Sequence, residues 1–191
     1  MKKSTIISIV VAGILVLAVF WGVGTRNSMV VANEDVKNKA SVVETQLQRR
    51  SDLIPNFVAT VKGYATHEEE VYTAIADARA KLSGAIEKDD IASVSKANAE
   101  LDSALSRLLV VVENYPELKA NENFIALQDE LAGTENRIAK AREDYNEEVK
   151  AFNQKIKVFP NSIIANMGGF KEADYFEAAE GAKTVPTVNF S

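Results

Sequence analysis

Apolar residues recur every three or four positions along most of the chain between residues 36 and 159. The first such stripe consists of Val36, Ala40, Val43 and Leu47. This spacing puts the apolar side chains on one face of an α-helix, because a helix completes a turn in about 3.6 residues. The pattern therefore predicts a first amphipathic helix over residues 27–50.

A polar stretch that contains a proline follows this first helix. Ser51 and Asp52 carry side-chain oxygens that can cap a helix N-terminus, and Pro55 stands where a first helical turn tolerates proline. A proline deep inside a helix costs about 3 kcal/mol. We therefore expect Asp52 and Pro55 to form a corner between two helices. A single kinked helix through Pro55 is the alternative.

Three further apolar stripes follow the expected corner. The first continues through Gly63 and ends near Ile86, where the polar run 87–90 intervenes and Asp90 can cap the next helix. The next stripe ends before Pro116, since the residue before a proline leaves the helical region. The last stripe runs to Pro160. Their members are Ile54, Phe57, Val61, Tyr64, Glu68, Val71, Ile75, Ala78 and Leu82; Ile91, Val94, Asn98, Leu101, Leu105, Leu108 and Val112; and Phe124, Leu127, Leu131, Thr134, Ile138, Ala141, Tyr145, Val149, Phe152, Ile156 and Phe159.

Helices with one apolar face each bury that face against a neighbour, and short polar connections favour antiparallel neighbours. The sequence thus predicts an all-α protein with an N-terminal transmembrane helix, an antiparallel up-and-down four-helix bundle and an irregular C-terminal tail. The expected boundaries are 1–26 for the anchor, 27–160 for the bundle and 161–191 for the tail. The apolar residues of the tail predict that it docks on the bundle or on a partner.

The predicted anchor is the uncharged segment Ser4–Thr25, which comprises 22 residues. As a helix it would span roughly 33 Å, against about 30 Å for the hydrocarbon core of a bilayer. Thr5 lies near one end, and Trp21 near the other end fits an interfacial aromatic side chain. A cleavable signal peptide is the rival interpretation, but no Ala-x-Ala cleavage pattern follows the segment.

The charges that flank the anchor predict its orientation. Lys2 and Lys3 precede the apolar segment, whereas Arg26 is followed by Glu34 and Asp35. Because positive residues stay on the cytoplasmic side, we expect the N-terminus in the cytoplasm and the body outside it. A bacterial cytoplasmic membrane with a single-pass protein is the resulting expectation.

Composition excludes several classes of function. The chain has 191 residues with 22 basic and 27 acidic side chains, a net charge of −5. This acidic balance argues against a nucleic-acid partner, whose phosphates require a basic surface. The chain contains no cysteine, which rules out disulfides and thiolate chemistry.

Several polar residues deserve a functional reading beside a structural one. His67 is the only histidine, and with acids on one side of it in sequence it is expected to be a solvated helix residue rather than a metal ligand. Glu68 and Asn98 fall on apolar stripes, where a buried carboxylate needs a partner and a buried amide can specify register. Arg49 and Arg50 fit a helix end and pairing with acids better than phosphate binding.

No nucleotide loop, nucleophile elbow or metal-ligand spacing occurs in the sequence. Tyr64, Tyr72 and Tyr145 stand at helical spacing and are expected in the core or at its rim. Catalysis therefore has no support from the sequence, and neither a metal nor another cofactor is expected.

Three long segments resemble the LemA family. They are QRRSDLIPNFVATVKGYATHE from Gln48, YPELKANENFIALQDELAGTENRIAKAREDYNEEVKAFNQKIKVFP from Tyr115, and GFKEADYFEAAEGAKTVP from Gly169. The resemblance extends from Glu34 to the C-terminus. It implies a bacterial membrane-anchored protein with an antiparallel four-helix body, and it implies no established catalytic activity, cofactor or set of catalytic residues.

Three hypotheses of function follow. The leading one is a non-enzymatic scaffold or interaction protein of the cell envelope, held in the lipid bilayer and binding other envelope proteins or itself. The second is a small-ligand or metal sensor with a polar pocket at Glu68, Asn98 and Tyr145. The third is an oligomeric membrane-shaping protein that assembles through the apolar residues between Ile163 and Phe170.

Overall fold

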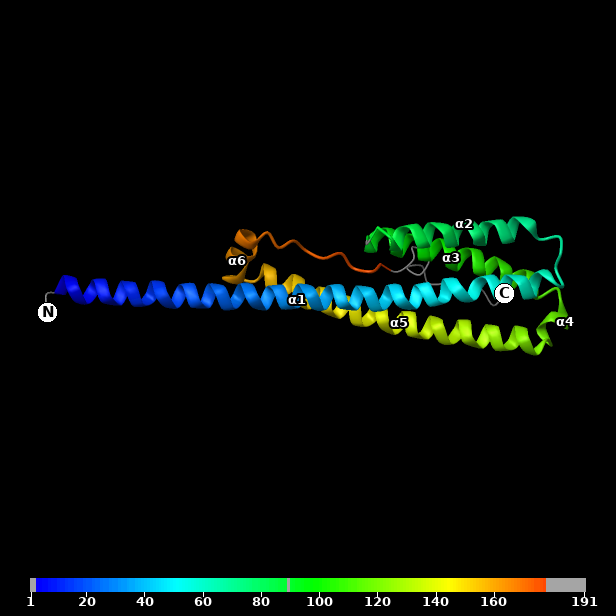
Figure 1. Cartoon of the computed structure of the whole chain (residues 1–191), viewed down its shortest axis with the longest axis horizontal. Helices are drawn as coiled ribbons and strands as arrows, with labels where there is room; N and C mark the ends of the chain where they lie inside the picture. Colours follow the sequence, from blue (N-terminus) through cyan, green and yellow to red (C-terminus); the bar gives the residue numbers. More distant parts are fainter. Residues whose placement is uncertain (1–2, 89, 178–191) are drawn as a thin grey trace, which may run out of the picture. The chain divides into compact units, whose positions relative to one another are not determined.

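The computed structural model of the chain describes residues 3–88 and 90–177. These residues form six α-helices and no strand (Figure 1), which confirms the all-α prediction. The predicted tail beyond residue 177, Lys2 before the apolar segment and Asp89 in the polar run 87–90 lie outside the described residues. The helices are α1 (Lys3–Lys62), α2 (Glu69–Ile86), α3 (Ile91–Val112), α4 (Pro116–Lys119), α5 (Glu122–Lys157) and α6 (Asn161–Gly168).

The long helix α1 passes through Pro55 without a corner, so the predicted corner at Asp52 and Pro55 is wrong. Both residues are exposed, which leaves the opposite side of the helix free to pack. On that side Ile54, Phe57 and Val61 are at most 2% exposed and continue the phase of the preceding stripe. Burial of side chains of this size contributes about 1.5–3 kcal/mol each, which exceeds the cost of about 3 kcal/mol for the proline.

The chain turns instead between α1 and α2, directly after Gly63. The N–H groups of Tyr64 and Ala65 both donate to the carbonyl of Val61, which closes the last turn of α1. Tyr72 in α2 reaches back to donate its hydroxyl to the carbonyl of Ala65 at 2.6 Å. Gly63, expected within a helix, therefore marks a helix end, and Glu68 is the residue before α2.

The predicted boundary between α2 and α3 is confirmed. Helix α2 ends at Ile86, and Asp90 precedes α3 with its carboxylate accepting from the N–H of Ala92 at 3.2 Å. The hydroxyl of Ser93 also donates to this carboxylate. The pKa of Asp90 lies below its ordinary value, chiefly because of the hydrogen bond from Ser93.

The last long helix and the start of the tail differ from the prediction in two ways. Pro116 begins the short helix α4, and α5 ends at Lys157, before the apolar pair Val158 and Phe159. Residues 161–168, predicted to be irregular, form α6, which Gly169 terminates with a φ of 72°. Glycine is favoured in this left-handed region, because the Cβ of any other residue would clash with the backbone.

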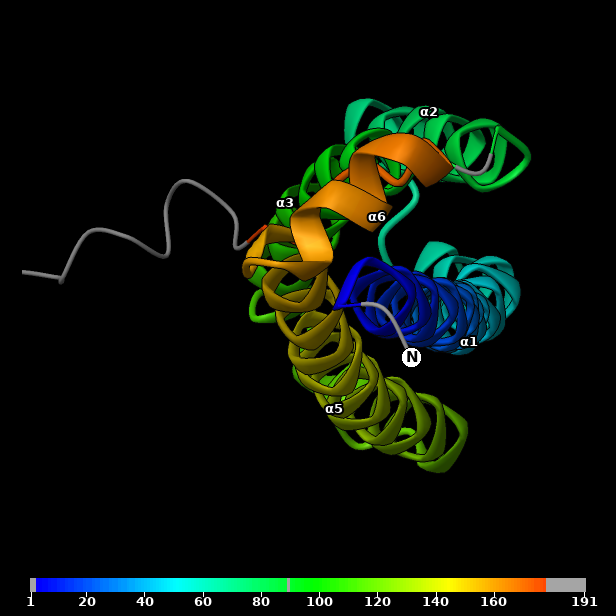
Figure 2. The same cartoon turned by 90° about the vertical axis from the view of Figure 1, so that its left-hand side faces the viewer.

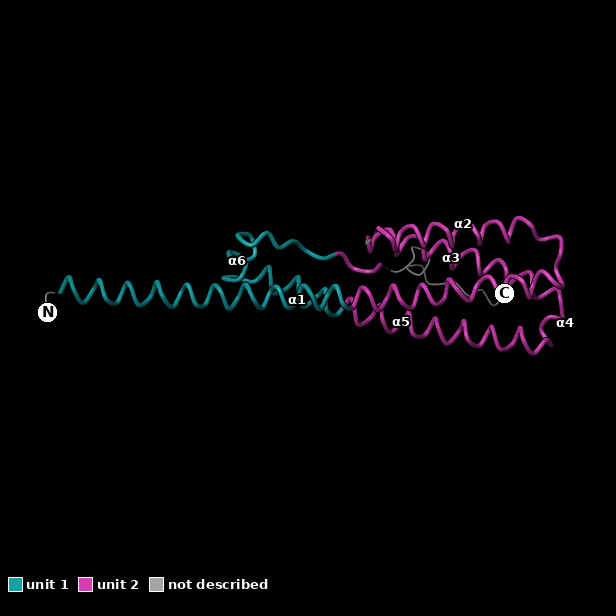
Figure 3. The backbone as a smooth tube through the Cα atoms, in the orientation of Figure 1, with its two compact units in different colours: residues 1–38, 147–173 teal, residues 39–146, 174–191 magenta. Residues whose placement is uncertain are grey.

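The chain divides into two compact units (Figure 3). The first consists of Met1–Asn38 and Glu147–Ala173, and it buries Met29, Val149, Phe152, Ile156 and Ala165. The second consists of Lys39–Asn146 and Asp174–Ser191, of which the structure describes residues up to 177. Both α1 and α5 contribute one part to each unit.

Side chains from four helices meet in the second unit, where α3 lies between α2 and α5 (Figure 2). The rings of Phe57 in α1 and Phe124 in α5 stack with centroids 5.2 Å apart. Arg79 of α2 donates to the hydroxyl of Ser51 in α1 at 3.1 Å. The fully buried aliphatic side chains of this core include Leu47, Ile54, Leu82, Leu101, Leu108 and Ile138.

The N-terminal part of α1 is long and apolar enough to cross a membrane, and no other described helix is. None of its most apolar 18-residue window is buried in the protein. The large apolar side chains that it exposes run from Ile6 to Val23, and Trp21 at 45% exposure stands among them near the end of the uncharged segment. The expected uncharged segment Ser4–Thr25, including Thr5, thus lies in a single helix with the start of the body.

Candidate functional site

Arg50 joins three helices through one buried guanidinium. Its Nη1 atom lies 2.5 Å from Oδ1 of Asp102 in α3 and 3.1 Å from Oε2 of Glu135 in α5. The same nitrogen donates to Oδ1 of Asn98 at 3.2 Å. The Arg50 side chain is 9% exposed, whereas the two carboxylate side chains are 37% and 45% exposed. The ionic junction is therefore buried at its centre and exposed to solvent at its rim.

A pocket of about 360 Å³ lies beside this junction. Arg50, Asp102 and Glu135 are the charged residues of its polar wall, while Phe57 and Leu105 belong to its apolar wall. Two carboxylates facing one guanidinium give the polar wall a formal charge of −1. Such a pocket can accept a small molecule with a cationic group and an apolar body.

Asn98, predicted to specify register, lies within the same network. It is 2% exposed, and its Nδ2 donates to Oδ2 of Asp102 one turn further along α3 at 3.1 Å. Its Oδ1 accepts from Arg50. Both ends of the amide are thus engaged, as a buried polar group requires.

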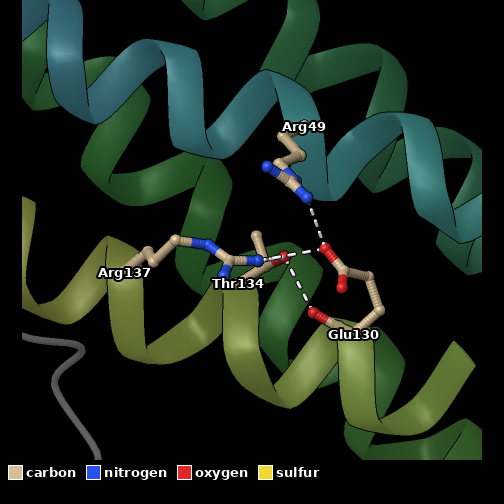
Figure 4. Close-up of polar contacts among 4 residues, drawn as sticks. All are labelled: Arg49, Glu130, Thr134 and Arg137. Atoms are coloured by element: carbon tan, nitrogen blue, oxygen red, sulfur yellow. Dashed lines mark hydrogen bonds and ion pairs between the residues drawn. The ribbon is translucent and has the colours of Figure 1, made fainter. Parts of the chain in front are cut away.

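Arg49, the neighbour of Arg50, forms a second junction on the exposed side of the same helix interface (Figure 4). Its Nη2 lies 2.6 Å from Oε1 of Glu130, and Nη2 of Arg137 lies 3.0 Å from that same oxygen. Arg137 also donates to Oγ1 of Thr134, whose hydroxyl donates to the carbonyl of Glu130. The side chains of Arg49, Glu130 and Arg137 are 40–55% exposed, so water screens these ion pairs. The expected pairing of both arginines with acids is confirmed, whereas the expected helix end is wrong, because α1 continues to Lys62.

Two asparagines of α5 hold the start of the tail by its backbone. Asn153 donates to the carbonyl of Ala173 and accepts from its N–H, both at 2.9 Å. Asn146 forms the same pair with Phe176, at 3.0 and 2.9 Å. The described tail residues thereby satisfy backbone groups without a neighbouring strand.

Phe176 fixes the tail in the second unit. Its side chain is 3% exposed, and the guanidinium carbon of Arg142 lies 4.4 Å from its ring centroid. Arg142 and the hydroxyl of Ser95 in α3 both donate to the carbonyl of Glu177. The tail therefore connects α5 to α3.

The three residues of the predicted polar pocket serve separate contacts. Glu68 is half-buried in the turn before α2, and Asn98 belongs to the Arg50 junction. The hydroxyl of Tyr145, a buried residue, donates to the carbonyl of Asp174 at 2.7 Å. The hydrogen bonds described here place Asn98 in the Arg50 junction and Tyr145 against the start of the tail, so a shared pocket with Glu68 stays a prediction.

His67 is exposed in the loop between α1 and α2, beside three successive glutamates. A shallow hollow there is lined by the consecutive residues 66–71. Within residues 3–88 and 90–177, no group of three or more His, Cys, Asp or Glu side chains has the arrangement to hold a metal ion. His67, expected as a solvated helix residue, is exposed but lies in a loop rather than in a helix.

The sequence arguments missed Asn146, Asn153 and Arg142. The two asparagines are seven residues apart, so they share one face of α5, and this spacing was the available signal. It was weak, because an amide in a helix predicts no particular partner. Their partner is a backbone, whose position no side-chain pattern reveals.

The model of the LemA family matches residues 39–190. The chain belongs to the LemA family. This match covers the second unit except for its last residue, and the part of the first unit that α5 and α6 supply.

Proteins similar to this LemA family member include two magnetosome proteins. Magnetosome protein MamQ 2 of Paramagnetospirillum magneticum is 29% identical over 181 residues, which cover 83% of this chain and 66% of that protein. Magnetosome protein MamQ of Magnetospirillum gryphiswaldense is 27% identical with the same coverage. The chain thus spans just under two thirds of the length of these relatives. Protein LemA of Metamycoplasma hominis is 27% identical over 169 residues, which cover 87% of this chain and 76% of that protein.

Proposed function

We propose that this LemA family protein is a membrane-anchored, non-enzymatic interaction or scaffold protein of the bacterial cell envelope. One observation carries the proposal: the exposed apolar segment of α1 continues as the same helix into the acidic body. The family membership and the magnetosome relatives support a place at a membrane. The body acts in this proposal as an antiparallel up-and-down four-helix bundle that presents its surface to partners.

The proposed location is the cytoplasmic membrane, with the N-terminus inside and the body outside the cytoplasm. Lys3 precedes the apolar segment, and acidic residues dominate the body that follows it. The chain lacks cysteine, so the substitution Ala76→Cys in α2 introduces a single thiol. Labelling of this thiol with a membrane-impermeant maleimide shows on which side of the membrane the body lies. Labelling in intact spheroplasts supports this orientation, and labelling only after lysis contradicts it.

The ion pairs of Arg49 and Arg50 support a non-enzymatic role, because they join helices of the body to one another. Arg50 is engaged with Asp102, Glu135 and Asn98, and Arg49 with Glu130. These groups link helices to one another, as in a structural ion-pair network. A catalytic acid or base needs instead a titratable group directed at a substrate.

The decisive experiment is site-specific photo-crosslinking in intact cells. A photoreactive amino acid placed at exposed positions such as Arg107 in α3 and Glu117 in α4 will capture any neighbour of the body. Discrete adducts that contain the same envelope protein from several positions support the scaffold. Turnover of a cell-wall polymer or phospholipid by the purified full chain, lost in a body variant, refutes the non-enzymatic role.

A small-ligand sensor is the second candidate, because the Arg50 junction adjoins a pocket with a charged wall and an apolar wall. An amphipathic amine is the ligand class that this pocket fits. Thermal unfolding of the full chain in detergent tests the idea with hexylamine and hexanol as a matched pair. A rise in the unfolding temperature with hexylamine alone, abolished by Glu135→Gln, supports the sensor; equal responses to both compounds contradict it.

A further inference from the structure

The first unit exposes a second apolar surface where α5 turns into α6. Val158, Phe159, Ile163 and Met167 are 58%, 77%, 51% and 81% exposed. Phe159, Ile163 and Met167 follow at intervals of four residues, which puts Ile163 and Met167 on one face of α6. We refer to these four side chains as the α6 patch. Large apolar side chains gathered in this way mark a surface that is covered by a membrane or a partner.

Helix α6 lies against the apolar part of α1. A Cβ built on Gly22 would stand 3.5 Å from Cδ1 of Ile164. Gly22 precedes Arg26, the first charged residue after the apolar segment, by four positions, or about 6 Å along the helix. Ile164 is therefore level with the last turn of the segment that is apolar enough to cross a membrane.

A hollow of about 340 Å³ lies at the same level, between α1 and the start of α6. Trp21, Ser28, Lys155 and Asn161 are among its lining residues. The Lys155 ammonium donates to the hydroxyl of Ser28 at 3.2 Å and to its carbonyl at 3.4 Å. An ammonium, a hydroxyl and an amide around one hollow are donors suited to a phosphate oxygen.

Contacts on both sides hold α6 in this position. Ala165 is buried, and the Phe152 and Phe170 rings meet edge to face at a centroid distance of 6.4 Å. After α6 in the chain, Oε2 of Glu172 lies 2.7 Å from Nζ of Lys157 at the end of α5. The α6 patch is thus part of the packed first unit rather than of a free tail.

We propose that the α6 patch inserts into the interface of the leaflet from which α1 emerges, with a phospholipid phosphate in the Lys155 hollow. The inference rests on the proposed membrane anchor and adds a second contact with the same bilayer. Lipid is the occupant because Phe20 and Val23, on either side of Gly22 in the sequence, are themselves exposed, at 73% and 54%, in the segment that is apolar enough to cross a membrane. Lys155, Lys157 and Lys171 lie close to the patch in sequence and complement anionic headgroups.

Fluorescence quenching by brominated lipids tests the proposal on the full chain. Single cysteines at Ile163 and Met167 carry a bimane label in vesicles of phosphatidylethanolamine and phosphatidylglycerol. Ile14→Cys in the apolar segment is the positive control, and Ala76→Cys in α2 is the negative control. Lipids brominated near the headgroup are expected to quench the labels at 163 and 167 but not the label at 76. Lipids brominated deep in the acyl chain are expected to quench the label at 14 most.

The controls separate failure of this proposal from failure of the anchor. Quenching at 14 without quenching at 163 and 167 overturns the α6 contact and leaves the anchor intact. No quenching at 14 overturns the anchor itself. Self-quenching of labels at 167 between copies, in place of quenching by lipid, overturns the proposal in favour of a second copy as occupant.

A charge reversal tests the hollow. Lys155→Glu is expected to reduce headgroup quenching at 167, because the new carboxylate repels a phosphate, whereas Lys155→Arg retains it. Circular dichroism confirms that both variants keep their helices. Equal quenching in the two variants overturns the phosphate site.

Discussion

The side-chain amide of Asn153 and the peptide unit of Ala173 form a reciprocal pair of hydrogen bonds, each 2.9 Å long. An asparagine amide has an N–H donor and a C=O acceptor, like a peptide group. An asparagine on a helix can therefore hydrogen-bond to an extended segment in the way that a neighbouring strand would. Asn146 repeats the pair with Phe176. Seven helical residues rise about 10.5 Å, and three extended residues cover about 10 Å. The spacing of the asparagines therefore matches the spacing of the backbone groups that they hold.

Asn153→Ala will loosen the tail. The change removes two hydrogen bonds from a residue that is 4% exposed and leaves the Ala173 peptide without its partner. We expect a loss of about 1–3 kcal/mol in the free energy of unfolding. Hydrogen exchange at the Ala173 amide, measured by mass spectrometry in detergent micelles, will be faster than in the wild type. The substitution Asn166→Ala, at an exposed position, is the control. Equal exchange at Ala173 in both variants would contradict the role of Asn153 in holding the tail.

The two adjacent arginines will respond differently to truncation. Arg50→Met removes a buried cation and leaves Asp102 and Glu135 facing one another. Breaking a buried pair costs about 3–5 kcal/mol, and the partial exposure of the carboxylates lowers our expectation to about 2–3 kcal/mol. Arg49→Met changes only exposed pairs and is expected to cost about 0–1 kcal/mol. Urea unfolding of both variants provides the measurement, and similar losses would show that the Arg50 junction is also screened.

Pro55→Ala is expected to stabilise the protein. Proline inside α1 deprives the Ser51 carbonyl of its helical donor, and alanine restores that N–H. The expected gain is about 2 kcal/mol after the greater freedom of the unfolded chain is taken into account. Thermal unfolding followed by circular dichroism measures it. A lower unfolding temperature would mean that the helix needs the proline at this position.

Acid will weaken the start of α3 through Asp90. The folded pKa of this carboxyl lies below its ordinary value, with the Ser93 hydrogen bond as the main cause. Ionised Asp90 therefore stabilises the fold above the pKa of the unfolded chain, and this contribution is lost as the pH falls through the folded pKa. Asp90→Asn retains a capping side chain that does not titrate. We expect the advantage of the wild type in unfolding temperature to shrink from pH 7 to pH 3; a constant difference contradicts the assignment.

Local signals predicted those parts of the fold that depend on few residues. The Asp90 cap, the end of α2 at Ile86 and the uncharged segment of α1 follow from neighbours in sequence. Pro55 was misjudged because its cost is local, whereas the burial of Ile54 and Phe57 that outweighs it depends on other helices. The cost of a proline in a helix can be estimated from the sequence alone. The burial of Ile54 and Phe57 is indicated only by their places in the repeating apolar pattern.

The candidate sites show the same limit. Asn98 was recognised as a buried polar residue from its place on a stripe, and its partners Arg50 and Asp102 lie on two different helices. Glu68 occupied an equivalent place in the pattern, yet the chain turns there and the residue is half-buried. The stripe predicts which face a residue occupies only while the helix continues.

The hydrogen bonds of Asn146 and Asn153 to the tail can form only late in synthesis of the chain. Residues 173–177 leave the ribosome after all six described helices, so α5 presents the side chains of Asn146 and Asn153 to water until the tail arrives. A chain that stops before Ala173 lacks both backbone partners of these amides. Its body would be less stable and would exchange and unfold more readily than that of a chain that includes residues 173–177. Resistance of the body to proteolysis therefore depends on whether these tail residues have been synthesised.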